Sequence, residues 1–280
     1  MSRKINDAAR LCHVFSLSAK SSDIPCIAFD QAFSEDGGLG ASIGLIDGTV
    51  DMMSPDLEGA DILTCDFVGS PDMSPDTVFH GTSMATLLVG QGRQYMRGVV
   101  PRAQLLAARA VGPGDVATPA RVAAAIDWLV SEGIRIVALP LGSETEAPAV
   151  DAAIARGVAV GVCFFAASGS GAGAVLYPAR HPAVIAVGAA DDQGHPIGDA
   201  RHKPPSDLLA PGWKIPGLSA NGAACNGSSI ACVLAAGVAA QQLGPIPQLG
   251  TGKGSDSLRS RLPVDASVRS GTDHDDAISG

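Results

Sequence analysis

Short apolar segments alternate with helical segments along most of this 280-residue chain. The apolar segments that we expect to be strands are residues 43–46, 61–67, 103–111, 134–141, 158–166 and 183–187. Residues 120–132 and 147–156 carry apolar side chains three and four positions apart, which indicates helices between strands. The segment at 103–111 is mostly apolar without a clear alternation, as expected of a parallel strand buried on both faces. The alternation therefore predicts an α/β fold with a mostly parallel sheet and helices on both faces.

Local signals support the helix at residues 120–132. Thr118 is a good N-cap residue, and Pro119 suits the first helical position because that position needs no N–H donor. Gly133 follows the last apolar residue and is expected to end the helix. Residues 41–243 are predicted to form one domain, preceded by an N-terminal extension at 1–40. From Gly244 the chain turns polar, and we expect 244–280 to be largely flexible.

Composition excludes several classes of function. The formal net charge of −9 argues against a nucleic-acid partner, which usually needs a basic face. No segment has the roughly 18 consecutive apolar residues of a membrane span. The six cysteines are expected to be free, buried thiols, because a chain this long needs no disulfide framework. None of them stands at metal-ligand spacing, so we expect neither a metal site nor a cofactor.

Three polar residues stand where strands or helices are expected to end or begin. Asp47 follows the strand at 43–46, His80 is expected to begin an apolar helix, and Ser229 follows Gly227 and Ser228 before the apolar run 232–240. Each has an ordinary structural explanation, as a turn residue, a helix residue and an N-cap serine. Together they have the order acid, histidine, serine of one type of catalytic triad.

The segments around these residues resemble the motifs of subtilisin-like serine peptidases. The matching segments are Ile46-Asp47-Gly48, His80-Gly81-Thr82 and Gly227-Ser228-Ser229-Ile230-Ala231, with weaker similarity at 177–189 and 210–212. The resemblance implies a subtilisin-like three-layer fold and a serine endopeptidase that forms an acyl-enzyme. It implies that Ser229 is the nucleophile, His80 its base, and Asp47 the residue that orients His80.

Residues 81–85 also spell the nucleophile motif, with Ser83 in the serine position. This segment directly follows His80, and the histidine motif of the family begins in the same way. A serine three positions after the base would abandon the order of the triad, so we expect Ser83 to have a structural role.

The chain departs from the family at the expected oxyanion hole and substrate strand. Ser170 stands where the family usually has an asparagine donor, which predicts a slower enzyme. Ala138 and Pro140 replace residues that are commonly polar, and Pro140 cannot donate a hydrogen bond to a substrate strand. The resemblance places substrate binding at Gly114, Leu139, Leu141 and Gly142. These departures leave open an alternative, a catalytically impaired pseudopeptidase that binds peptides in the same groove.

The resemblance also bears on calcium, substrate and location. Calcium is common in the family, but the loop at 92–98 has two cationic residues and no carboxylate, so a site there is not expected. Residues 190–196 are most similar to cyanobactin-type (PatA-like) maturation peptidases, which implies a peptide or protein substrate such as a precursor with a leader. Asp7 and Arg10 interrupt the only segment that resembles a secretory signal. We therefore expect a cytoplasmic enzyme, with secretion the less favoured location.

Overall fold

The structure is a computed structural model that describes residues 26–27, 37–70, 74–169, 174–197, 206–216, 218 and 224–243. All of these residues fall within one compact unit, Met1–Ile246. The expectations for residues 1–25 and 244–280 lie outside the described residues. In the described part of the chain, no helix is both long enough and apolar enough to cross a membrane.

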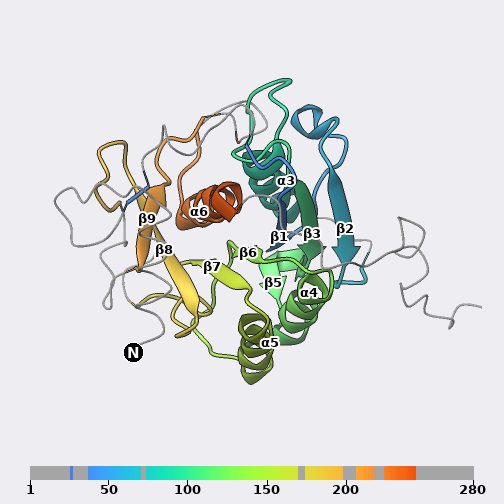
Figure 1. The fold of residues 1–280 in the computed structure, drawn as a ribbon, viewed down its shortest axis with the longest axis vertical. Coiled ribbons are helices and arrows are strands. Elements are labelled where there is room, and N and C mark those ends of the chain that lie inside the picture. The colour runs from blue at the N-terminus through green and yellow to red at the C-terminus, as the bar shows by residue number, and fades with distance from the viewer. Residues whose placement is uncertain are drawn as a thin grey trace, which may run out of the picture. The chain divides into compact units, whose positions relative to one another are not determined.

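The core of the fold is a seven-stranded sheet in which every neighbouring pair is parallel (Figure 1). Its strands stand in the order β2-β3-β1-β6-β7-β8-β9. Their bounds are β1 Ser42–Asp47, β2 Ile62–Asp66, β3 Gln104–Arg109, β6 Ile136–Leu139, β7 Cys163–Ala167, β8 Val184–Ala190 and β9 Leu208–Pro211. Because the strands are parallel, their carboxyl ends meet at one edge of the sheet, which is where ligands bind in open α/β sheets.

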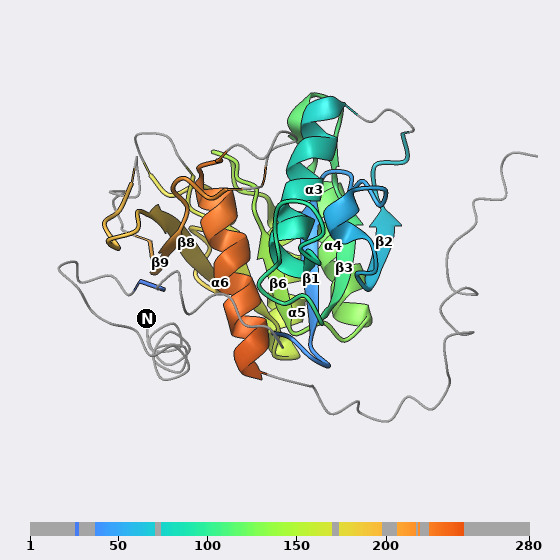
Figure 2. The same ribbon diagram turned by 90° about the horizontal axis from the view of Figure 1, so that it is seen from above.

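Two layers of helices cover the sheet, as Figures 1 and 2 show. Helices α3 (Pro75–Val89) and α6 (Ser228–Leu243) pack on one face, and α4 (Pro119–Ser131) and α5 (Pro148–Ala159) pack on the other. Two separate apolar cores lie on the two sides of the sheet. The predicted α/β fold, with a mostly parallel sheet between two layers of helices, is confirmed.

The start and end of α4 follow the sequence signals. The Thr118 side chain accepts a hydrogen bond from the Arg121 N–H at the N-cap, and Pro119 takes the first helical position. Gly133 follows the helix with a φ of +78°, a left-handed conformation that glycine adopts without strain. The expected apolar face is buried against the sheet.

Two expected starts were wrong by five residues each. His80 does not begin its helix: α3 starts five residues earlier, because Ser74 caps it and Pro75 occupies its first position. The strand expected at 158–166 begins only at Cys163, since α5 continues through Ala159. Gly161, with a φ of +88°, makes the turn that separates the helix from the strand. Apolar character alone did not distinguish these two conformations.

Five short elements were not expected. The hairpin of β4 (Val111–Gly112) and β5 (Val116–Ala117) follows β3 and encloses the 3-10 helix η2 (Pro113–Asp115). A second 3-10 helix, η1 (Pro55–Leu57), precedes β2. Strand β9 pairs with β8 at the edge of the sheet.

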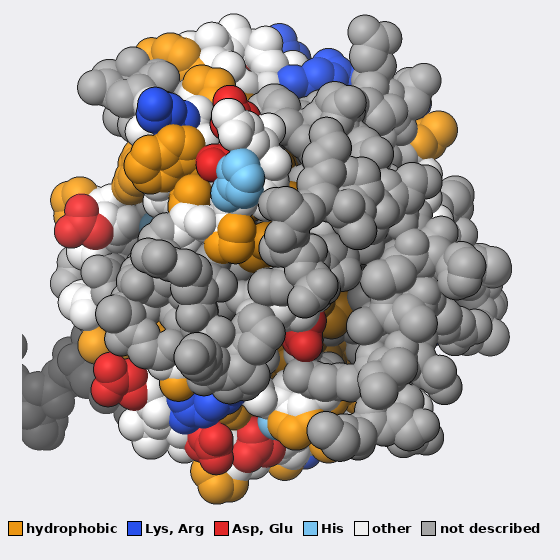
Figure 3. All heavy atoms as spheres, turned by 90° about the vertical axis from the view of Figure 1, so that its left-hand side faces the viewer, with side chains coloured by type: hydrophobic (Ala, Val, Ile, Leu, Met, Phe, Trp, Pro, Cys, Tyr) orange, Lys and Arg blue, Asp and Glu red, His pale blue; other side chains and the backbone are white. Residues whose placement is uncertain are grey.

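On the face shown in Figure 3, described acidic and basic side chains are scattered among apolar ones and do not gather by sign.

Candidate active site

Asp47 is the last residue of β1, at the carboxyl edge of the sheet. Its strand lies between β3 and β6, so the side chain is buried although it is charged. The Gly48 N–H donates to Asp47 Oδ1 at 2.6 Å, which satisfies part of the hydrogen-bonding capacity of the carboxylate. A buried carboxylate needs such partners, and the main one comes from α3.

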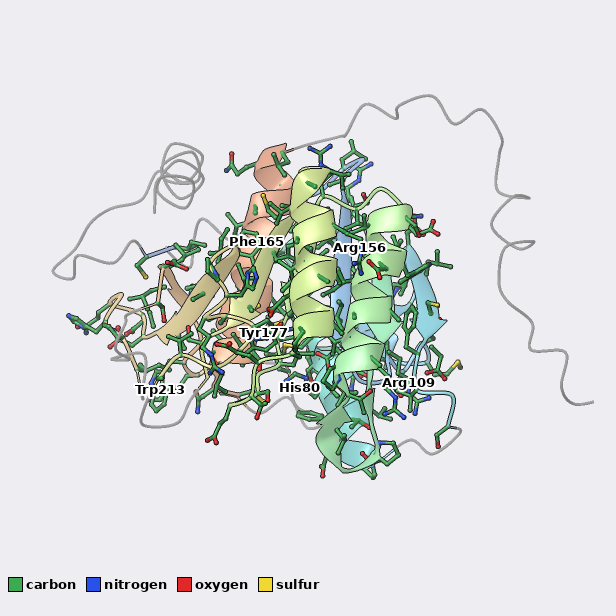
Figure 4. The ribbon with its side chains drawn as sticks, turned by 90° about the horizontal axis from the view of Figure 1, so that it is seen from below. His80, Arg109, Arg156, Phe165, Tyr177 and Trp213 are labelled. Carbon is green, nitrogen blue, oxygen red and sulfur yellow. The ribbon has the colours of Figure 1, made fainter. Side chains whose placement is uncertain are left out.

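His80 lies in the second turn of α3 and contacts Asp47 with its Nδ1 atom. The Nδ1 atom is 2.9 Å from Asp47 Oδ1 and 3.0 Å from Oδ2. Because a carboxylate accepts hydrogen bonds, this arrangement favours the tautomer with the proton on Nδ1 and leaves Nε2 able to accept one. The His80 side chain is 40% exposed, whereas the carboxylate behind it is covered. Figure 4 shows His80 at the end of the molecule where α4 and α5 begin.

Two glycines allow this pair to form. A Cβ atom on Gly81 would lie 2.6 Å from the Thr49 carbonyl oxygen, and one on Gly48 would lie 2.4 Å from the Thr77 carbonyl oxygen. Both distances are shorter than any normal contact, so only glycine lets the backbone of α3 approach the end of β1 this closely. The glycines next to Asp47 and His80 are thus part of the geometry that brings the two side chains together.

Ser229 is the second residue of α6, and Gly227 precedes the helix with a φ of +152° that favours glycine. The Ser229 hydroxyl donates to the Pro140 carbonyl oxygen at 3.0 Å. A hydroxyl has one proton, so in this rotamer the proton is directed to Pro140 and must turn before another base receives it. The first N–H groups of a helix have no partner within the helix, so the start of α6 offers donors to a developing negative charge.

Two other serines, Ser228 and Ser83, form hydrogen bonds to the backbone. The Ser228 hydroxyl accepts a hydrogen bond from the Gly169 N–H at 3.2 Å, which ties the start of α6 to the loop after β7. Ser170, the expected oxyanion donor, lies outside the described residues. The buried Ser83 hydroxyl donates to the Leu218 carbonyl oxygen at 2.8 Å. This contact is consistent with the structural role expected for Ser83.

A cavity of about 770 Å³ opens beside His80 and Asp47. Among the predicted substrate-binding residues, Leu141 and Gly142 line it. Leu139 instead has a fully buried side chain in the core, and Gly114, in η2, does not line the cavity. Ser229 adjoins the cavity through its contact with Pro140, which is a lining residue.

Much of the cavity wall was not predicted from the sequence. The other lining residues, of which only Val116, Pro140 and Ser143 lie in segments expected to border the substrate, are Asp76, Thr77, Phe79, Val111, Val116, Ala117, Pro119, Val122, Pro140, Ser143, Thr145, Glu146, Ala147, Val150, Tyr177 and Pro178. Residues distant in sequence meet here because Ser143 and Tyr177 form an antiparallel bridge. The Tyr177 hydroxyl donates to Asp151 Oδ1 at 2.8 Å. Burial, with the Asp151 contact, raises the pKa of Tyr177 above its ordinary value, so the Tyr177 hydroxyl carries no charge near pH 7.

The loop expected to lack calcium is organised by a carboxylate. Asp56 is buried and accepts hydrogen bonds from the N–H groups of Gln94, Tyr95 and Met96, at distances between 2.7 and 3.2 Å. Within the described ranges, no three His, Cys, Asp or Glu side chains form a group that could hold a metal ion. Calcium independence stays a prediction.

The cysteines in the described part of the chain are free, as expected, but only Cys232 is fully buried. Burial, and to a smaller extent the charge of Asp47, raises the pKa of Cys232 above its ordinary value. The Cys232 thiol therefore stays protonated at neutral pH and is a poor nucleophile. The Cys232 thiol is therefore not a candidate nucleophile, whereas the half-buried His80 lines the cavity.

Comparison with known proteins supports the same interpretation of the site. A protein-family model described as the subtilase family (Peptidase_S8) matches residues 38–263. The chain is 32% identical over 180 residues to M-protease from Shouchella clausii, a match that covers 62% of this chain and 47% of that protein. It thus spans about half the length of the curated relatives it matches first.

Solved structures of maturation proteases are also similar. The prenylagaramide maturation protease PagA is 28% identical with a TM-score of 0.63, and the match covers 74% of this chain and 76% of PagA. The protease domain of PatA is 26% identical with a TM-score of 0.65, and the match covers 75% and 81% of the two chains. Since the family model covers most of the sequence and the fold agrees with it, this chain belongs to the subtilase family of serine peptidases.

Proposed function

We propose that this chain is a serine endopeptidase in which Asp47, His80 and Ser229 form the catalytic triad. The observation that carries the proposal is the contact of His80 Nδ1 with both carboxylate oxygens of buried Asp47, beside a cavity. A histidine held in this way keeps Nε2 as a proton acceptor at the cavity. The family motif, the chain order and the position of Ser229 at the start of α6 support its role as nucleophile.

The reaction begins when Ser229 transfers its hydroxyl proton to His80 Nε2 and its Oγ bonds to the substrate carbonyl carbon. The electron pair of the carbonyl moves to oxygen, which becomes the oxyanion. When the oxyanion collapses, the carbon–nitrogen bond breaks and His80 donates its proton to the leaving amine. Water then attacks the acyl-enzyme by the same steps and releases the acid. Asp47 holds the tautomer and stabilises the imidazolium.

The oxyanion needs donors, and the Ser229 N–H at the start of α6 is one of them in this proposal. Ser170 is proposed as the second donor. It directly follows Gly169, whose N–H is bound by the Ser228 hydroxyl. The start of α6 therefore contains Ser229 and is also hydrogen-bonded, through Ser228, to Gly169, the residue before Ser170.

The proposed substrate is a peptide or a protein precursor. The two structural relatives named above are maturation proteases, which supports a processing role for this chain. Leu141 and Gly142 follow β6 and line the cavity, so their backbone is suited to pair with an extended peptide. Pro140 has no N–H donor, so pairing at that position depends on carbonyl oxygens.

Labelling with a fluorophosphonate tests the proposal directly. The wild-type protein should be modified at Ser229, as mapped by mass spectrometry, and should cleave peptides. Ser229→Ala and His80→Ala should abolish cleavage, whereas Ser83→Ala should retain it, since Ser83 bonds to Leu218 away from the cavity. If folded wild-type protein is neither labelled nor cleaves any peptide, the binding-only alternative replaces this proposal.

A further inference from the structure

The cavity beside His80 has a one-sided distribution of charge. Its lining includes three carboxylate side chains, from Asp47, Asp76 and Glu146, and no lysine or arginine. Its remaining wall is apolar or neutral, with a concentration of valine, alanine and proline from the β4–β5 hairpin and the start of α4. A substrate that fills this cavity therefore meets negative charge and no compensating positive charge from a lining lysine or arginine.

The three carboxylates differ in their partners. Asp47 is covered by His80, with both oxygens within hydrogen-bond distance of Nδ1. Glu146 Oε1 lies 3.1 Å from the Nε atom of Arg180, which offsets its charge. Asp76 is exposed, and within the described ranges no cationic side chain forms an ion pair with it. Asp76 is thus the carboxylate on the cavity wall whose charge is left for a ligand.

Asp76 also stands close to the reacting groups. It precedes His80 by four residues within α3, so the two side chains lie on the same face of the helix, with Cβ atoms about 6 Å apart. An extended peptide rises about 3.3 Å per residue. A long cationic side chain that reaches Asp76 would therefore belong to a residue within about three positions of the scissile bond.

On this basis, and resting on the proposed endopeptidase function, we propose that Asp76 is a specificity-determining residue. It selects peptides that carry lysine or arginine near the scissile bond, because their cation pairs with the Asp76 carboxylate during binding and reaction. Asp76 also lies in the first turn of α3, where a carboxylate stabilises the helix through the dipole. The test must therefore separate selectivity from stability.

The experiment compares preferences within each variant. A peptide library is first cleaved with wild-type protein, and the sites are identified by mass spectrometry. Matched peptides with Lys, Gln or Glu at the preferred position then give kcat/KM for wild type, Asp76→Asn and Asp76→Lys. Wild type should prefer Lys over Gln by about fivefold, the upper end for an exposed ion pair. Asp76→Asn should abolish this preference, and Asp76→Lys should shift it towards Glu.

Two matched controls accompany these variants. Asp192→Asn removes one exposed carboxylate outside the cavity and should keep the wild-type preference. Glu146→Gln should change the preference for Lys over Gln less than Asp76→Asn does, because Glu146 already pairs with Arg180. The wild-type preference should also weaken when salt is raised from 10 mM to 500 mM, since screening shortens the range of the charge. The preference is the ratio of kcat/KM for two peptides measured on the same variant. A loss of folded protein lowers both values equally, so the ratio does not depend on stability.

Each failure has a separate meaning. If wild type cleaves peptides without preference for a cation, or if Asp76→Asn keeps the preference, this inference is refuted and the proposed function stands. If no peptide is cleaved, the proposed function fails. Binding of the Lys and Gln peptides to Ser229→Ala, measured by fluorescence anisotropy, then decides the role of Asp76 without turnover. Equal affinities there would refute it.

Discussion

Replacement of Gly81 by alanine should separate His80 from Asp47 while the protein stays folded. The added Cβ would lie 2.6 Å from the Thr49 carbonyl oxygen, whereas ordinary contacts begin at 3.4 Å. Helix α3 would thus have to move by about 0.8 Å, and His80 would move with it. The Nδ1 contacts to Asp47, now 2.9 and 3.0 Å, would lengthen to roughly 3.7 Å, beyond a hydrogen bond.

The expected loss follows from this displacement. A misplacement of about 1 Å in a catalytic group can cost on the order of 100-fold in rate, so kcat/KM should fall by about that factor. Overpacking at the same contact should lower the free energy of unfolding by about 1–3 kcal/mol. The assays are kcat/KM on one peptide, the rate of fluorophosphonate labelling, and thermal unfolding.

Gly133→Ala provides the control for stability. Gly133 ends α4 with a φ of +78°, and a Cβ there would meet no atom within 4 Å. The substitution should cost about 1 kcal/mol through backbone strain and leave kcat/KM unchanged. If Gly81→Ala keeps kcat/KM within threefold of wild type while it is as destabilised as Gly133→Ala, the glycine contact does not position His80.

Three further predictions concern other parts of the molecule. Ser170→Asn should raise kcat about tenfold with little change in KM, because a carboxamide donor stabilises the transition state more than the bound substrate. If Ser170→Asn lowers kcat and Ser170→Ala leaves kcat unchanged, Ser170 is not an oxyanion donor. Chelation of calcium should leave the melting temperature unchanged, whereas Asp56→Asn should lower the free energy of unfolding by about 2 kcal/mol, because three N–H groups lose a charged acceptor. A large drop on chelation that added calcium reverses would contradict this. The folded-state pKa of Cys232 is raised above 9.0, so only the unfolded thiol ionises just above that pH. Stability from Cys232 is therefore fully present below pH 9 and falls by up to about 1.4 kcal/mol per pH unit above it. Cys232→Ala should lack this part of the slope in pH-dependent denaturation, and equal slopes would show that the thiol does not contribute.

Capping residues and apolar runs in the sequence correctly predicted some of the helices and strands. Thr118 and Pro119 located the start of α4, and continuous apolar runs located the central strands. The start of α3 was missed because Ser74 and Pro75 look like loop residues until a helix is known to follow. Strand β9 was missed because a four-residue edge strand has too short a pattern to stand out.

The candidate site was predicted where motifs exist and missed where tertiary contacts create it. The contact of Asp47 with His80 follows from their motifs, and the structure brings the two together. Asp76 and Glu146 have no motif, and they reach the cavity because a helix and a loop from different layers converge on it. Tyr177 forms part of the wall through its bridge to Ser143, a pairing that depends on the register of distant segments.

The carboxylate of Asp56 has a consequence for how the loop after α3 depends on its surroundings. A bound ion stabilises a protein by mass action, so its contribution rises and falls with the concentration of the free ion. Asp56 is covalently part of the chain, and its effective concentration at the Gln94, Tyr95 and Met96 amides is fixed by the fold. The order of this loop should therefore be the same in dilute buffer, in chelator and in ion-rich medium.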